Sequence, residues 1–222
     1  MMELGTVAHI WRYPVKSMRW EAPTAVDVDS EGLRGDRTSA LIVRDGHART
    51  GKTLRGKEHD RLHLMDDPAS AVASAADRGI ATELRGDENR YFDAAPVSLL
   101  LDRWLDGVSA HVGYPVEPVR FRPNFFVRAA AGFAGDETSL VGVTLAIGEV
   151  RLAVRCAIER CVAITYHPEG EPPDPRILRY VANERATLMG VYCDVLRAGV
   201  ARAGDSVFAE RTPRTIASSA SM

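Results

Sequence analysis

The chain is poor in the features that would place it among secreted, membrane or nucleic-acid-binding proteins. It has three cysteines in 222 residues, too few for a disulfide framework. No apolar run approaches the roughly 18 residues of a membrane span, and the N-terminus lacks the charged-then-apolar pattern of a signal peptide. The net charge of −2 gives no basic footprint for nucleic acid. We therefore expect a cytoplasmic protein with free thiols, and neither a membrane nor a nucleic acid as partner.

Lysine is also scarce. Only Lys16, Lys52 and Lys57 are lysines among the 28 basic residues, and the rest are arginines. Genomic base composition is the plain explanation, but the bias makes Lys16 more notable. With 222 residues, 45% of them hydrophobic, the chain can bury a sizeable core in one large domain or two small ones.

Strand patterns dominate the chain. Alternation and β-compatible runs predict extended segments, at residues 6–12, 38–43, 61–65, 91–97, 119–128, 189–196 and 205–208. Residues 144–165 are typical of a hairpin that turns near Gly148, and Asp45-Gly46 is a strong signal for a second hairpin turn. Residues 212–222 are small and polar, as in a frayed end.

Helices are fewer. Asp67-Pro68 predicts a helix that ends at Gly79, and Asp174-Pro175 a helix to about residue 184. Ser98 is expected to cap a third helix over residues 99–111, because its apolar residues form one stripe. Since strands and helices do not alternate regularly, the fold class is α+β, mainly β, with barrel-like sheets.

Two motif matches fail on their context. Gly46 to Thr53 fits the P-loop formula, but a hairpin turn opens it and residues 53–60 show no helix to cradle a phosphate. His59 and His63 have the spacing of a helical zinc pair. That segment alternates, so we expect both histidines on a solvated strand face rather than on a metal.

Cys161, in Arg160-Cys161-Val162, is the main chemical candidate. A thiolate is a soft metal ligand and a nucleophile, although core packing is the alternative for any single cysteine. Cys156 lies five residues earlier on the same expected strand, and odd spacing points the two to opposite faces. A shared metal site or a disulfide is therefore not expected, and Cys193 is most simply a core residue.

Basic and polar residues cluster at three places that could hold a phosphate or a polar ring. These are Tyr13-Pro14-Val15-Lys16-Ser17, Gly32-Leu33-Arg34-Gly35-Asp36-Arg37 and Arg122-Pro123-Asn124. Proline inside a strand belongs at an edge or a bulge, where the flanking side chains can point at a ligand. A plain loop, a turn with an Asp36–Arg37 ion pair and a surface edge strand are the respective alternatives.

In this order, the segments resemble one family. The first two clusters and the hairpin ending at Arg49-Thr50 resemble the N-terminal β-barrel domain of MOSC proteins, named for the molybdenum cofactor sulfurase C-terminal domain. The resemblance to the MOSC domain itself rests on the third cluster, the Cys161 motif, the acidic Pro-bearing loop after it, Gly190-x-Tyr192 and residues 199–207. The nearest functional relatives would be the mitochondrial amidoxime-reducing component and its bacterial counterparts.

The resemblance implies an architecture and a cofactor. A barrel-like MOSC N-terminal domain over 1–92 would pack on a MOSC β-barrel domain over 93–210, with a disordered tail at 211–222. The cofactor would be pterin-based molybdenum cofactor (Mo-molybdopterin), with Cys161 as the thiolate on molybdenum. The pterin and its phosphate would be held by Lys16, Ser17, Arg37, Arg122 and Asn124, with further polar contacts from Ser98 and Tyr192.

The implied activity is reduction of a small N-hydroxylated or N-oxide substrate. An external donor, ferredoxin, flavodoxin or a cytochrome b5-like protein, would return two electrons. Two alternatives stay open: a sulfur-transfer protein that carries a persulfide on Cys161 with no cofactor (and no pyridoxal phosphate in this chain), and a non-catalytic carrier of the cofactor. Residues 136–140 lack the tryptophan of the family's acidic segment, so substrate and donor are less well indicated than the cofactor.

Overall fold

The computed structural model describes residues 1–44, 49–86 and 90–210. The expected Asp45-Gly46 turn and the tail at 211–222 lie outside this range. Seven strands of the described chain form one closed barrel, which confirms the mainly β, α+β class. Around the barrel, the strands are β1 (Met2–Ile10), β12 (Ser206–Glu210), β8 (Thr144–Ile147), β9 (Val150–Glu159), β10 (Leu188–Arg197), β6 (Val97–Leu101) and β7 (Phe125–Ala129).

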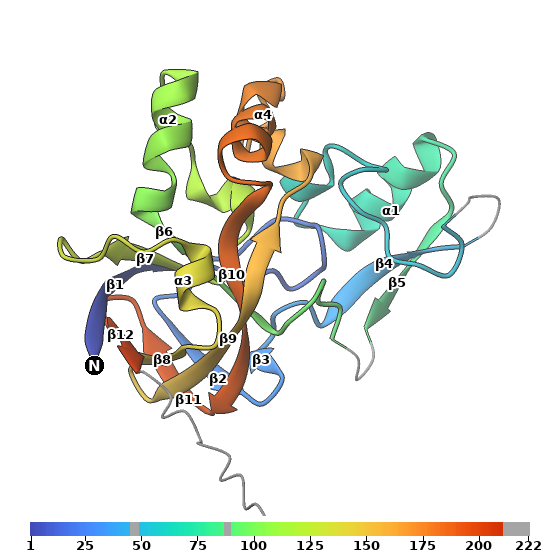
Figure 1. The fold of residues 1–222 in the computed structure, drawn as a ribbon. Helices are drawn as coiled ribbons and strands as arrows, with labels where there is room; N and C mark the ends of the chain where they lie inside the picture. Colours follow the sequence, from blue (N-terminus) through green and yellow to red (C-terminus); the bar gives the residue numbers. More distant parts are fainter. Residues whose placement is uncertain (45–48, 87–89, 211–222) are drawn as a thin grey trace, which may run out of the picture.

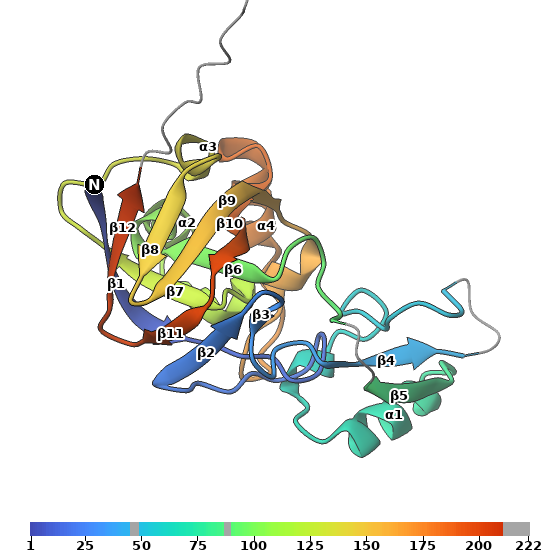
Figure 2. The same cartoon turned by 90° about the horizontal axis from the view of Figure 1, so that it is seen from below.

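Two smaller sheets flank the barrel. One contains β11 (Gly199–Arg202), β2 (Ala25–Asp29) and β3 (Gly32–Leu33), and the other pairs β4 (Ser39–Val43) with β5 (Thr82–Gly86). Figure 2 shows β4, β5 and α1 (Pro68–Asp77) projecting to one side of the barrel. Because β1 lies between β12 and β7, and β2 pairs with β11, strands from the two ends of the chain are joined to each other.

The apolar side chains fall into separate cores. The large one fills the barrel and the space under α2 (Asp106–Val112) and α4 (Pro175–Glu184), which lie side by side over one end of the barrel (Figure 1). A second core packs α1 against β4 around Leu41, Leu54 and Leu62. Between them lies a small cluster of Trp11, Tyr13 and Val119. The region between the two main cores is where the loops from both ends of the chain meet.

Two helices begin as predicted. The Asp67 carboxylate accepts hydrogen bonds from the backbone N–H groups of Ala69 and Ser70, and Pro68 occupies the first position of α1. Asp174 likewise accepts from the N–H of Arg176 at the start of α4. The other helices are short, including α3 (Glu137–Leu140). Within the described ranges, no helix combines the length and apolar character that crossing a bilayer requires.

The helix predicted over 99–111 is wrong at its start. Ser98 lies within β6, and all five residues of that strand are buried between β10 and β7. A strand covered on both faces is a continuous apolar run, which periodicity alone does not separate from a buried helix. Only the later part is helical, as a 3-10 turn at Asp102–Trp104 and then α2.

Two predicted strands are also corrected. Residues 61–65 contain a 3-10 turn, Leu62–Leu64, because Leu62 is inserted into the second core. His59 is fully buried with its Nε2 3.0 Å from Ser74 Oγ, so the expected solvated strand face is wrong. The segment 119–128 divides into a 3-10 turn, Pro118–Phe121, and β7.

The extended segment predicted over 91–97 is wrong, because only its last residue, Val97, lies in a strand, at the start of β6. Other strand predictions are confirmed. The predicted hairpin forms as β8 and β9 with Gly148 in the turn. Its second strand ends at Glu159 rather than at residue 165, so Cys161 lies beyond the strand that carries Cys156. β10 and β12 cover the predicted terminal strands. From Thr53 to Asp60 no helix forms, as the rejection of a P-loop requires.

A paired glycine experiment tests the barrel seam. A Cβ at Gly5 (φ +153°) would lie 1.9 Å from the carbonyl oxygen of Arg128 on β7, whereas one at Gly204 (φ +93°) meets nothing within 4 Å. Gly204→Ala should cost only its backbone strain, about 1–2 kcal/mol. Gly5→Ala should cost more than about 4 kcal/mol, because the backbones must separate. Urea unfolding measures both, and equal losses would contradict the steric explanation.

Candidate functional site

Loops from both halves of the chain enclose a polar cavity of about 300 Å³ between the two main cores. It lies where the segment after β1, the turn after β3, the end of β9 and the start of β6 approach one another. The lining residues are Lys16, Ser17, Arg37, Arg55, Gly56, Lys57, Asp93, Ser98, Arg120, Phe121, Arg122, Ile158, Glu159, Arg160, Cys161, Ala163, Ile164 and Tyr192. Every predicted site residue except Asn124 is in this set.

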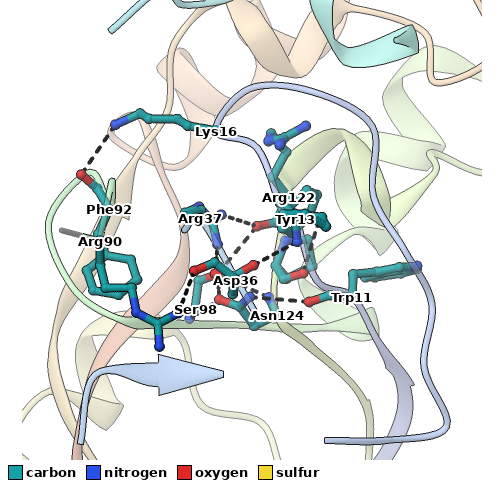
Figure 3. Close-up of polar contacts among 12 residues, drawn as sticks. Trp11, Tyr13, Lys16, Asp36, Arg37, Arg90, Phe92, Ser98, Arg122 and Asn124 are labelled. Carbon is teal, nitrogen blue, oxygen red and sulfur yellow. Dashed lines mark hydrogen bonds and ion pairs between the residues drawn. The ribbon is translucent and has the colours of Figure 1, made fainter. Parts of the chain in front are cut away.

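The buried ring of Tyr13 organises the basic wall. The guanidinium carbon of Arg122 lies 4.1 Å from the ring centroid and that of Arg37 lies 4.7 Å away. The Tyr13 hydroxyl donates to the carbonyl of Pro123 at 3.1 Å, and its backbone N–H donates to the fully buried carboxylate of Asp36 at 2.7 Å. Burial raises the pKa of Tyr13, so the phenol stays protonated and keeps this hydrogen bond (Figure 3).

The two arginines on this ring differ in their partners. Arg37 Nη1 donates to Asp36 Oδ2 at 2.5 Å, which establishes the ion pair that the sequence left as an alternative. Arg122 Nη2 is buried, and among residues 1–44, 49–86 and 90–210 it has no hydrogen-bond partner. Burial lowers the pKa of Arg122 to about 10, and the positive charge of Arg37 also lowers it. Arg122 is thus a buried cation without an ion pair in the described ranges, although the carboxylates of Asp36 and Asp93 act on it at longer range.

Backbone strain concentrates at the same cavity. Ser17, Arg37 and Arg122 all have positive φ, of 68°, 49° and 50°. Apart from glycines, only Ala186 and Thr187 share this conformation in the described part of the chain. Such residues cost about 1–3 kcal/mol each and cluster at binding sites. In all three, the strained backbone aims a polar side chain at one shared space.

Lys16 adds a further positive charge at the opening. Its Nζ lies 2.7 Å from Asp93 Oδ1 and donates to the carbonyl of Phe92 at 3.3 Å (Figure 3). Burial would raise the pKa of Asp93, but the charges of Lys16, Arg37 and Arg122 outweigh it and hold that pKa below its usual range. Asp93 is therefore a carboxylate at neutral pH and neutralises Lys16 in this state.

Cys161 supplies the thiol. It follows β9 with an extended backbone and precedes the 3-10 turn Val162–Thr165, and its side chain is exposed to the cavity. Cys193 is fully buried in the barrel core, as predicted, and burial raises its pKa. Cys156 lies on β9 opposite Tyr192 of β10 and does not line the cavity. Of the three thiols, only that of Cys161 lines the cavity.

Asn124 supports the site from behind. It is 1% exposed, its Oδ1 accepts from the N–H and hydroxyl of Ser98, and its Nδ2 donates to the carbonyl of Trp11. These bonds tie β6, β7 and the end of β1 together. The predicted direct ligand contact is corrected: Asn124 positions Ser98, whose side chain lines the cavity.

Sequence reasoning missed Arg160. Its Nε donates to the carbonyl of Met189 at 2.6 Å and its Nη1 to that of Phe121 at 2.8 Å. Gly190 has a positive φ of 87°, and a Cβ there would lie 3.0 Å from the backbone oxygen of Leu99 and 2.7 Å from Arg160 Nη2, so glycine is favoured at this position. Burial lowers the pKa of Arg160 to about 10. Its place directly before Cys161 was the available signal.

The donor set fits an anionic ligand with a soft metal. Guanidinium and ammonium groups with a hydroxyl and a phenol suit a phosphate and a polar ring, and the thiol of Cys161 suits a metal that takes sulfur. A bound anion would supply the partner that Arg122 lacks among the described residues. In the same residues, no group of three or more His, Cys, Asp or Glu could hold a bare metal ion. A metal here would need other ligands, as one carried by a cofactor has.

Comparisons with known proteins identify sequence relatives and a shared fold. Mitochondrial amidoxime reducing component 2 of Bos taurus is 22% identical over 94% of this chain and 84% of its own length. Mitochondrial amidoxime-reducing component 1 of Xenopus laevis is 30% identical over 53% of this chain and 37% of its own. The crystal structure of the YUAD protein from Bacillus subtilis has the same fold, with a TM-score of 0.55 and 16% identity over 91% of this chain and 93% of that one.

The family assignment follows from the sequence models. Residues 4–75 match the MOSC N-terminal beta barrel domain. Residues 86–208, more than half of the chain, match the MOSC domain, and they include the basic wall at Arg122 and the thiol of Cys161. The chain belongs to the MOSC domain family.

Proposed function

We propose that the cavity binds a pterin-based molybdenum cofactor and that the protein reduces N-hydroxylated or N-oxide compounds. The observation that carries the proposal is that one cavity contains both the exposed Cys161 thiol and the buried Arg122 guanidinium, whose Nη2 has no hydrogen-bond partner among the described residues. The names of the curated relatives support the reductase assignment. Reduction needs electrons, which we assign to an external ferredoxin, flavodoxin or cytochrome b5-like donor.

Each side chain has a stated role in this proposal. Arg122, Arg37, Lys16 and Ser17 hold the phosphate and the ring edge, Ser98 and Tyr192 add polar contacts, and Cys161 is the protein's ligand to the metal. When bound, the cofactor supplies two-electron oxygen-atom chemistry. The protein contributes orientation, a shaped cavity and the groups behind the ligands.

Sulfur transfer is the second candidate, because the exposed Cys161 thiol could carry a persulfide without any metal.

Protein purified from a molybdenum-replete host should contain molybdenum and pterin near one per chain and should turn over a simple hydroxylamine. Persulfide on Cys161 without molybdenum would favour sulfur transfer. Molybdenum without turnover would favour a carrier.

Cys161→Ser should give a folded protein that loses molybdenum, because serine replaces a soft sulfur with a hard oxygen at similar volume. Cys156→Ser and Cys193→Ser are the controls, and should keep the metal while costing stability at most. Metal analysis with thermal melting separates these outcomes. Equal molybdenum in all three variants would show that the thiolate assignment is wrong.

Arg122→Ala and Arg37→Ala should separate ligand binding from stability. Both should weaken cofactor retention by roughly ten- to hundred-fold, the value of a charge-assisted hydrogen bond of about 1.5–3 kcal/mol. Only Arg37→Ala should destabilise the cofactor-free protein by about 3 kcal/mol or more, because it leaves the Asp36 carboxylate buried and unpaired. Equal unfolding curves for the two variants would contradict this division.

Lys52→Ala should change neither cofactor content nor turnover, and no saturable ATP or GTP binding is expected at micromolar nucleotide. Lys52 is exposed and is absent from the cavity lining, whereas Lys16 lines it. Lys16→Ala is therefore the matched variant and should lower cofactor retention. Magnesium-dependent nucleotide binding that vanishes in Lys52→Ala would instead restore the P-loop interpretation.

A further inference from the structure

A small apolar recess opens from the side of the cavity. Its own walls are Trp20, His63, Val119, Tyr166 and Pro168, and its volume is about 60 Å³. Ser17, Gly56, Arg120, Arg122 and Ala163 line both the recess and the cavity. A group held in this side recess would thus be continuous with a ligand beside Arg122 and close to the Cys161 segment.

The aromatic walls of the side recess are fixed by contacts that are remote in sequence. The Tyr166 hydroxyl donates to the carbonyl of Gly56 at 3.1 Å, and His63 Nε2 lies 2.8 Å from the carbonyl oxygen of His167. The rings of His63 and Tyr166 stack, with centroids 5.8 Å apart. Rings held in this way form a preformed surface, as binding pockets require.

The side recess carries no charge on its aromatic walls. Burial lowers the pKa of His63, and the nearby charge of Arg122 lowers it further against the raising effect of the His167 carbonyl. The imidazole is therefore neutral at pH 7. Since the carbonyl of His167 accepts, the proton is on Nε2. Trp20, Val119 and Pro168 are apolar, and the charged residues of the recess lining, Arg120 and Arg122, are both cations that it shares with the cavity. A cationic group would therefore lose its hydration in the recess without a partner, and an anionic group would be drawn to the shared arginines rather than to the apolar walls.

The size of the side recess limits its occupant. At about 10–15 Å³ for each water molecule, 60 Å³ holds roughly four to six waters, or a group near the size of one ring. We propose, building on the function proposed above, that the side recess binds the uncharged aryl or branched alkyl substituent of the N-oxygenated substrate. Trp20 is then a specificity-determining residue that sets both affinity for this substituent and its maximal size.

Binding of a small aryl probe tests the proposed occupant of the side recess without any enzymatic turnover. In fluorine NMR, 4-fluorobenzyl alcohol should bind the cofactor-free and the molybdenum-loaded protein alike, while trifluoroethanol should not bind. Trp20→Ala should weaken aryl binding at least about fivefold, through loss of aromatic contact, and Trp20→Phe should be intermediate and keep the fold. Tyr180→Ala is the matched control, because Tyr180 is a half-buried ring on α4 that packs against His111. Unchanged binding in both Trp20 variants would overturn the proposal, as would displacement of the probe by cofactor.

Steady-state kinetics gives a second test, whose outcome is independent of the NMR binding experiment. The loaded enzyme should prefer an aryl N-hydroxyamidine over its methyl analogue by at least fivefold in kcat/KM, and Trp20→Ala should abolish the preference that Tyr180→Ala retains. An equal preference in wild type and Trp20→Ala would overturn the proposal. If a protein carrying molybdenum and pterin reduces neither compound, the reductase function has failed, and the NMR result decides the side recess by itself.

Discussion

The stack of Arg37 and Arg122 on the buried Tyr13 ring is the interaction on which the site depends. Two guanidinium groups that share one ring repel each other, and within the described ranges only Arg37 forms an ion pair with a carboxylate, that of Asp36. The ring's π face offsets part of this cost. The remaining cost falls on Arg122, whose pKa burial lowers to about 10. Arg122 is therefore preorganised to bind an anion, because the anion adds an attractive charge and no ion pair within the described chain has to be broken first.

The fold provides this arrangement by joining the two ends of the chain. Tyr13 and Lys16 follow β1, Arg37 follows β3, and Arg122 precedes β7, which pairs with β1. Asn124 then links the strands directly, because its one amide contacts Ser98 on β6 and the carbonyl of Trp11. A change in the pairing of β1 with β7 would therefore move the Tyr13 ring relative to the Arg122 guanidinium that stacks on it. The strained backbone at Ser17, Arg37 and Arg122 is tolerated because the barrel holds the segments on either side.

The sequence predicted most of the elements but not how some of them are buried. The capped helices at Asp67 and Asp174 and the hairpin at Gly148 were predictable, because their signals are local. β6 was mistaken for a helix because the barrel and the helices above it bury both of its faces. The site residues came from motif resemblance. Contact geometry alone separates Asn124, which lies behind the cavity wall, from Arg160, which lines the cavity and is held by the carbonyls of Met189 and Phe121.

The same geometry explains why the polar cavity and the side recess can serve different parts of one ligand. The cavity is rich in positive charge and is bordered by Lys16, Arg37 and Arg122, whereas the side recess has a neutral imidazole and apolar walls. Arg122 lines both, with one side of its guanidinium against Tyr13. An anionic group gains most in the cavity, and an uncharged ring gains most in the recess. A ligand, or a pair of ligands, with an anionic group in the cavity and an uncharged ring in the side recess would fill both sites beside Cys161. A simple inorganic anion would fill only the cavity.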